Sequence, residues 1–86
     1  MIEKEKVLET IQPIPSDTKV KAWIFQVEDK FYQVSSYLGY RRGYITSVWE
    51  STKKGKRIGT EIFTIDNNTD HIKCVNEFID SYELKH

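Results

Sequence analysis

The residues best suited to chemistry lie in one basic and aromatic segment, residues 35–57. The segment carries six basic residues and one acidic residue, together with three tyrosines and one tryptophan. Cationic side chains bind phosphate groups, and aromatic rings stack on nucleobases for about 1–3 kcal/mol per base. The candidate contact residues are the cations Arg41, Arg42, Lys53, Lys54, Lys56 and Arg57 and the rings Tyr40, Tyr44 and Trp49.

A competing interpretation treats the same segment as ordinary structure. Lysines around Gly55 suit an exposed turn, and the rings between the two basic loops suit a hydrophobic core. Under that interpretation the charges flank a strand and bind nothing.

Metal-ligating residues are few. His71 and Cys74 are three residues apart on a predicted helix, a spacing that brings two ligands to one face. A zinc site needs three or four ligands, and the remaining histidine, His86, is the last residue. The favoured interpretation is that Cys74 is a buried thiol and that His71 simply begins the helix. We therefore expect no metal and no cofactor.

Catalytic motifs are also missing from the sequence. No Gly-x-Ser-x-Gly motif occurs, and the glycines are not closely set between a strand and a helix as in a phosphate-binding loop. The prediction is that the chain is not an enzyme.

The elements that position these residues follow from hydrophobic periodicity. Residues 1–12 predict a short helix with Val7, Leu8 and Ile11 on one stripe, ended by Pro13 and Pro15. A helix this short must pack on its own sheet or on a partner, because it is marginal alone.

A period of two then predicts a four-strand antiparallel meander over residues 19–66. The first strand is apolar on both faces, with Ala22 and Ile24 on one and Trp23 and Phe25 on the other. Residues 69–84 predict a C-terminal amphipathic helix whose apolar stripe is Ile72, Val75, Phe78, Ile79 and Tyr82. The expected fold class is α+β, a single small domain over residues 1–86.

The charge distribution and the composition of the chain bear on its partners and its cellular location. Net charge is zero, but residues 35–57 carry net +5 (six basic minus one acidic) and residues 58–86 net −4 (two minus six). Such an asymmetry steers association with charged partners. A single cysteine, no signal peptide and no apolar run of about 18–20 residues predict a cytoplasmic chain that does not cross a membrane.

The order of meander strands and a final helix, over residues 20–84, resembles the PUR-repeat proteins of the Pur-alpha type. It is also similar to the related transcription-coactivator and Whirly-type binders of single strands. The stretches that carry the resemblance are Lys30-Phe31-Tyr32, Arg42-Gly43-Tyr44-Ile45, Val48-Trp49-Glu50-Ser51 and Glu77-Phe78-Ile79-Asp80-Ser81-Tyr82. The resemblance implies single-stranded DNA or RNA binding on the sheet near Arg42, Tyr44, Trp49 and Lys54, often by a homodimer. The N-terminal helix is outside that pattern.

Two functional hypotheses follow, both non-catalytic. The first is single-stranded DNA or RNA binding through the basic loops and the sheet aromatics. The second is a protein-interaction module, such as a regulator or inhibitor of a larger assembly, because tyrosine, tryptophan and arginine also anchor protein interfaces.

Overall fold

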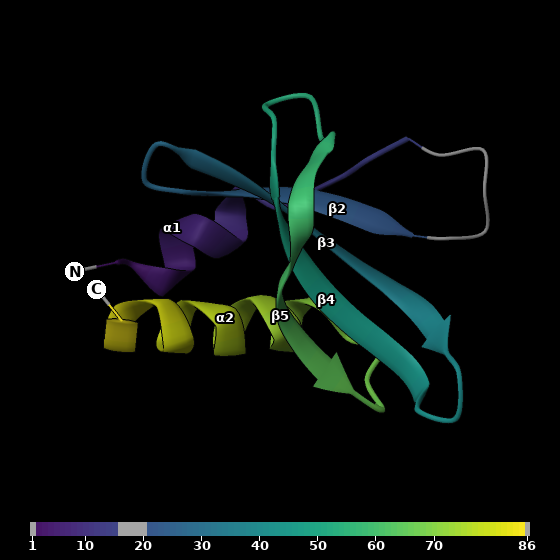
Figure 1. Ribbon diagram of the computed structural model, residues 1–86. Coiled ribbons are helices and arrows are strands. Elements are labelled where there is room, and N and C mark those ends of the chain that lie inside the picture. Colours follow the sequence, from purple (N-terminus) through teal and green to yellow (C-terminus); the bar gives the residue numbers. More distant parts are fainter. Residues whose placement is uncertain (1, 16–20, 86) are drawn as a thin grey trace.

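The computed structural model of the chain describes residues 2–15 and 21–85, with side chains through Glu83. The order of elements is α1 (Lys4–Glu9), β1 (Gln12–Pro13), β2 (Ala22–Val27), β3 (Lys30–Gly39), β4 (Gly43–Ser51), β5 (Arg57–Asp66) and α2 (His71–Lys85). The strands form one antiparallel sheet in the order β1-β2-β3-β4-β5, so each lies beside its neighbour in sequence (Figure 1). The predicted α+β class with an antiparallel meander is confirmed.

The strand count differs from the prediction, because the described residues form five strands and not four. The additional strand, β1, pairs Gln12 with Ile24 and Pro13 with Trp23. The helix predicted over residues 1–12 ends at Glu9. Thr10 caps it, with its hydroxyl donating to the carbonyl of Val7 at 2.6 Å and accepting the backbone N–H of Gln26 in β2. Proline lacks the N–H that a central strand needs, but an edge strand tolerates it. The start of the predicted meander, residues 19 and 20, lies outside the described residues.

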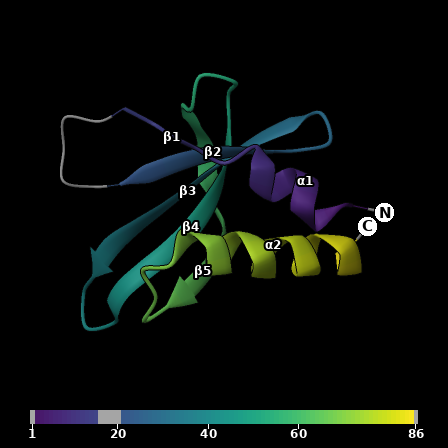
Figure 2. The same ribbon diagram turned by 180° about the vertical axis from the view of Figure 1, so that it is seen from behind.

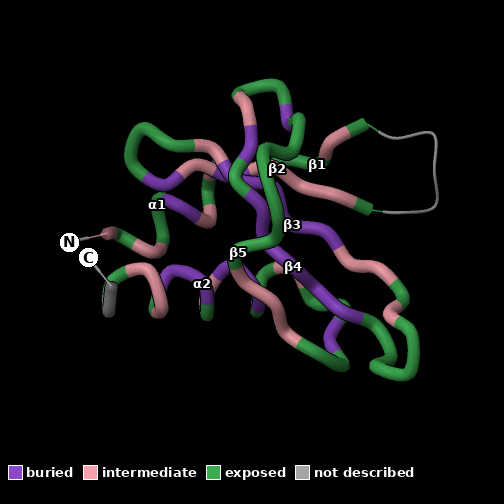
Figure 3. The backbone as a smooth tube through the Cα atoms, in the orientation of Figure 1, coloured by how far each residue is buried: buried purple, intermediate pink, exposed green. Residues whose placement is uncertain are grey.

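Both helices cover the same face of the sheet. The core joins Val7 of α1 and Val75, Phe78 and Ile79 of α2 to strand residues of that face, among them Phe25, Val34 and Val48. The two helices lie on one side of the sheet in both views, with the chain ends close together (Figures 1 and 2). In the burial view the buried positions run along β3, β4 and the sheet-facing side of α2 (Figure 3). The N-terminal helix therefore packs on its own sheet.

On the face opposite the two helices, the bent β5 and the β4–β5 turn fold back over the sheet. The register of β4 and β5 shifts on both sides of Trp49, and β5 changes direction along its length (Figure 1). Bulges of this kind bend a strand and increase its twist. The β4–β5 turn is thereby tied to this face, where the buried Gly55 accepts a hydrogen bond from Gln33 Nε2 at 2.6 Å and lies against Ile14.

Candidate functional site

The two basic loops lie at opposite ends of β4, as the predicted meander requires. Arg41 and Arg42 are in the β3–β4 turn, and Lys53, Lys54 and Lys56 are in the β4–β5 turn. All five side chains are exposed. At about 3.3 Å per residue, the nine residues of β4 separate the loops by roughly 30 Å.

The face between these loops does not present the predicted rings. Trp49 is only 8% exposed. The guanidinium of Arg57 lies 3.8 Å from the centroid of its ring. The same guanidinium donates hydrogen bonds to Gln33 Oε1 and to Ser35 Oγ. Trp49 and Arg57 thus contact their own sheet. They lie at the end of β4 that leads to the lysines of the β4–β5 turn, away from the β3–β4 turn.

The β3–β4 hairpin does present its rings to solvent. Tyr40 is 83% exposed and Tyr44 is 54% exposed, while Leu38, the cross-strand neighbour of Tyr44, is 70% exposed. Arg41 lies 5.1 Å from the centre of the Tyr40 ring. Arg42 forms an ion pair with Asp66, so part of its charge is neutralised. Tyr40, Arg41 and Tyr44 form the exposed group that we call the hairpin tip.

The chain after β5 holds the hairpin in place. The backbone N–H of Asn68 donates to the carbonyl of Tyr44 at 3.1 Å. The hydroxyl of Thr46 donates to the carbonyl of Asn68 at 2.6 Å. Because these bonds attach the segment before α2 to β4, they also set where α2 begins over the sheet.

A cavity of about 460 Å³ lies next to the hairpin tip, on the face that carries the helices. Its described lining is Lys21, Trp23, Ser36, Tyr44, Thr69 and His71, and we call it the hairpin-end cavity. It exists because α2 begins only at His71, so the helix leaves this end of β2, β3 and β4 uncovered. Tyr44 belongs both to the cavity and to the hairpin tip.

The inner wall of the hairpin-end cavity is a pair of stacked rings. The ring centroids of Trp23 and His71 are 3.7 Å apart, and the ring planes differ by 4°. Burial lowers the pKa of His71 below its ordinary value of 6.5, against a smaller opposing effect of Asp70. His71 is therefore a neutral aromatic ring at neutral pH.

Sequence reasoning missed Leu38 and most of this cavity. Alternation along the first strand does place Lys21 and Trp23 on one face, and His71 does stand at the predicted start of the last helix. The missing information was the strand register, which brings these residues toward Ser36 and Tyr44.

The potential metal ligands are separated by their packing. Cys74 is fully buried under α2, and burial, with a smaller effect of Glu77, raises the pKa of its thiol to about 12. His71 stacks on Trp23 instead. Across residues 2–15 and 21–85, no group of three histidine, cysteine or acidic side chains is arranged to hold a metal ion.

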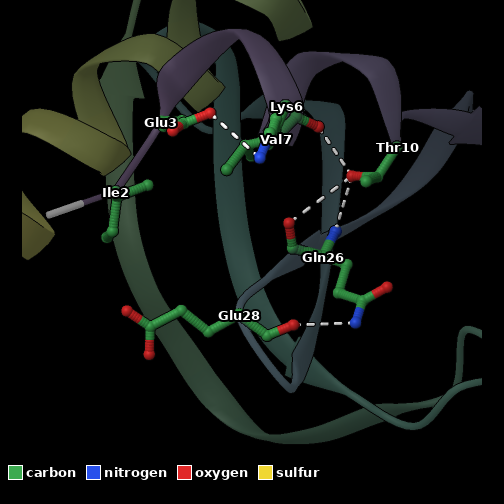
Figure 4. Close-up of a pocket in the computed structure, with 7 residues that line it drawn as sticks. All are labelled: Ile2, Glu3, Lys6, Val7, Thr10, Gln26 and Glu28. Carbon is green, nitrogen blue, oxygen red and sulfur yellow. Dashed lines mark hydrogen bonds and ion pairs between the residues drawn. The ribbon is translucent and has the colours of Figure 1, made fainter.

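A second cavity, of about 350 Å³, lies between α1 and the β2–β3 hairpin (Figure 4). Its polar groups bond to one another. The Thr10 hydroxyl accepts from the backbone N–H of Gln26 at 2.9 Å, and the Gln26 amide donates to the carbonyl of Glu28 at 2.7 Å. The first bond attaches the end of α1 to β2, and the second lies within the β2–β3 hairpin, so this cavity has a structural explanation.

A third cavity, of about 250 Å³, opens beside the free edge of β5. Its apolar lining is Tyr32, Ile62, Phe63, Phe78 and Tyr82, and Lys30, Glu50 and Ser81 complete it. Ile58 and Ile62 on β5 are about half exposed. This edge is an apolar surface separate from the hairpin tip.

Comparisons with known proteins give no further guidance. No model of a protein family, no curated protein and no solved structure matches the chain. Among the helices of the described residues, none combines the length and the apolar character needed to cross a membrane.

Proposed function

We propose that the chain is a non-catalytic module that binds single-stranded nucleic acid, and that it does so at the hairpin tip. The observation that carries the proposal is the exposure of Tyr40 and Tyr44, which flank Arg41 in the sequence, together with the contact of Arg41 with the Tyr40 ring. Exposed rings offer stacking surfaces for unpaired bases, and an arginine between them offers a partner for phosphate. This function is the one that the PUR-type resemblance implies. The proposed contact with nucleic acid, however, lies at the β3–β4 end of the sheet and not on the sheet face.

The backbone of Arg41 supports the same proposal. Its φ is +62°, a left-handed conformation in which most residues other than glycine, asparagine and aspartate are unfavourable by about 1 kcal/mol or more. Glycine would occupy this turn position with less strain. An arginine held there at a cost to stability agrees with a functional demand for its charge.

The lysines of the β4–β5 turn have a secondary role in this proposal. Lys53, Lys54 and Lys56 lie about one strand length from the hairpin tip, so a short oligonucleotide does not contact both loops. They attract a polyanion at long range and contact only longer strands. Binding therefore tightens with oligonucleotide length and weakens with salt.

The test is fluorescence anisotropy with labelled single-stranded DNA and RNA at low and moderate salt. Tyr40→Ala/Tyr44→Ala is expected to weaken binding by about 1–3 kcal/mol per contacting ring. Trp49→Phe is the aromatic control, because the Trp49 ring is covered by Arg57. No binding by the wild-type protein at low salt, or equal losses for the control and the tyrosine variants, would refute the proposal.

A second candidate function is protein interaction through the free edge of β5. It is favoured by the half-exposed Ile58 and Ile62 beside an aromatic-lined cavity. A free edge strand accepts an additional strand from a partner protein or from a second copy in a homodimer. Light scattering after size exclusion on wild type and Ile62→Lys tests the homodimer. A dimer that the lysine abolishes supports it, and a wild-type monomer rejects it.

A further inference from the structure

The hairpin-end cavity has the size of a small-molecule site. Small-molecule sites occupy about 300–1,000 Å³, and this cavity of about 460 Å³ lies within that range. Strands β2, β3 and β4 form its floor, where Trp23, Ser36 and Tyr44 come from three consecutive strands. The start of α2 closes one side with Thr69 and His71. The cavity is thus built on rigid elements of the fold.

The chemistry of the lining favours a flat aromatic ligand. Rings make up half of the described lining, namely Trp23, Tyr44 and His71. Planar rings attract further rings through offset stacking or edge-to-face contact, and nucleobases are such rings. The parallel arrangement of Trp23 and His71 is already a stack that a third ring would extend.

The charge of the lining favours an anion on that ligand. With His71 neutral, Lys21 carries the only formal charge among the described lining residues. Asp70 is not among the described lining residues, and its Oδ1 accepts the backbone N–H groups of Ile72 and Lys73 at the start of α2. Because the Thr46 hydroxyl donates to the carbonyl of Asn68, the Ser36 hydroxyl donates to Thr46 and can still accept a hydrogen bond from an N–H or O–H group of the ligand.

We propose that the hairpin-end cavity holds one unpaired nucleotide, with its base against the Trp23–His71 pair and its phosphate on Lys21. This inference rests on the proposed function, and it names the subsite that such a strand would use. Tyr44 joins the hairpin-end cavity to the hairpin tip, because it belongs to both. A strand bound at Tyr40 and Arg41 would continue over Tyr44 into the cavity.

The experiment uses Trp23 as its own reporter. The chain has two tryptophans, so Trp49→Phe leaves Trp23 as the single tryptophan, whose emission is excited selectively at wavelengths that tyrosine does not absorb. We expect adenosine monophosphate to quench Trp23 emission saturably, and ribose 5-phosphate, which lacks the base, to leave it unchanged. Lys21→Ala is expected to weaken the binding of adenosine monophosphate about five- to tenfold, because the phosphate loses its cation. The affinity for adenosine, which has no phosphate, is expected to change little. Lys30→Ala, at an exposed lysine that begins β3, is the matched control and is expected to change the affinity for neither compound.

If Trp49→Phe fails to fold, the indole N–H resonances of wild-type protein replace emission as the readout. The Trp23 signal is then expected to shift with adenosine monophosphate while the covered Trp49 signal stays in place.

The outcomes separate this inference from the proposed function. Oligonucleotide binding by anisotropy without a change at Trp23, and without an effect of Lys21→Ala, overturns the nucleotide subsite and leaves the proposed function standing. Saturable quenching by adenosine monophosphate without oligonucleotide binding supports the subsite and overturns the proposed function. An absence of both overturns both.

Discussion

The guanidinium of Arg57 lies 3.8 Å from the centroid of the Trp49 ring and covers it. Both residues are candidate ligand contacts from the sequence, and in the structure they contact each other. Gln33 and Ser35, both buried, receive the hydrogen bonds of the same guanidinium. One side chain therefore provides hydrogen-bond donors for two buried polar groups of the second sheet face and covers the Trp49 ring.

Arg57→Ala is expected to lower the free energy of unfolding by about 1–3 kcal/mol, because it removes a cation–π contact and leaves polar groups of the sheet without a partner. Urea unfolding followed by circular dichroism measures the loss. Lys56→Ala, an exposed neighbour in the chain, is the control and should shift stability by less than about 0.5 kcal/mol. If Arg57→Ala unfolds like wild type but loses oligonucleotide binding, Arg57 is a ligand contact instead.

Arg41→Gly is expected to separate binding from stability. Glycine relieves the left-handed strain at φ +62°, so the free energy of unfolding should stay unchanged or rise by up to about 1 kcal/mol. Oligonucleotide affinity should fall, and the slope of log affinity against log salt should decrease by about 0.7 for a lost phosphate contact on a single strand. Lys30→Ala removes an equal charge at the other end of β3 and should leave the slope unchanged. An unchanged salt slope in Arg41→Gly would show that Arg41 makes no phosphate contact.

Gly43→Ala is expected to destabilise the hairpin that carries the tip. Gly43 has φ +70°, and an added Cβ would lie 2.6 Å from Asn67 Oδ1. Gly59→Ala is a matched control, because its φ is +71° but no atom lies within 4 Å of the added Cβ. Both variants lose about 1 kcal/mol to backbone strain, and the excess loss in Gly43→Ala measures the clash with Asn67. Equal losses in urea unfolding would mean that Asn67 moves aside freely.

His71 is expected to make stability depend on pH in the mildly acidic range. Burial lowers its pKa in the folded state below the ordinary value of 6.5, so the unfolded chain binds the proton more readily. This contribution to stability is complete above about pH 6.5 and is lost as pH falls through 6.5 toward the folded pKa. The urea midpoint measured from pH 8 to pH 5 should fall less in His71→Phe, which keeps a ring against Trp23 without a titrating group. Identical falls in both proteins would assign the pH dependence to other groups.

Much of the fold was determined by local sequence. The apolar spacing of Val75, Phe78 and Ile79 predicts the sheet-facing side of α2, and these residues are buried there. Strand alternation and turn residues predict the hairpins, and therefore the positions of the two basic loops at opposite ends of β4. Such features are readable because helix period, strand period and turn chemistry depend on residues a few positions apart.

Other features needed contacts between residues distant in the chain. The two-residue strand β1 carries no periodic signal and forms because Gln12 and Pro13 meet β2. The closure of the second face depends on the register shifts beside Trp49, which no local pattern encodes. The sequence alone thus showed that residue 49 is aromatic and residue 57 is cationic. Only the tertiary structure showed that the Arg57 guanidinium packs on the Trp49 ring.

Part of the candidate site was also predictable from the sequence, and part required the tertiary structure. Composition alone pointed to Tyr40, Arg41 and Tyr44, and their place at a hairpin between two strands made them exposed. The hairpin-end cavity required the tertiary structure, because it arises where α2 begins too late to cover the sheet and where strand register sets Trp23 against His71. Local sequence decides which elements form and which residues they carry, whereas the packing of one element on another decides which surfaces remain open.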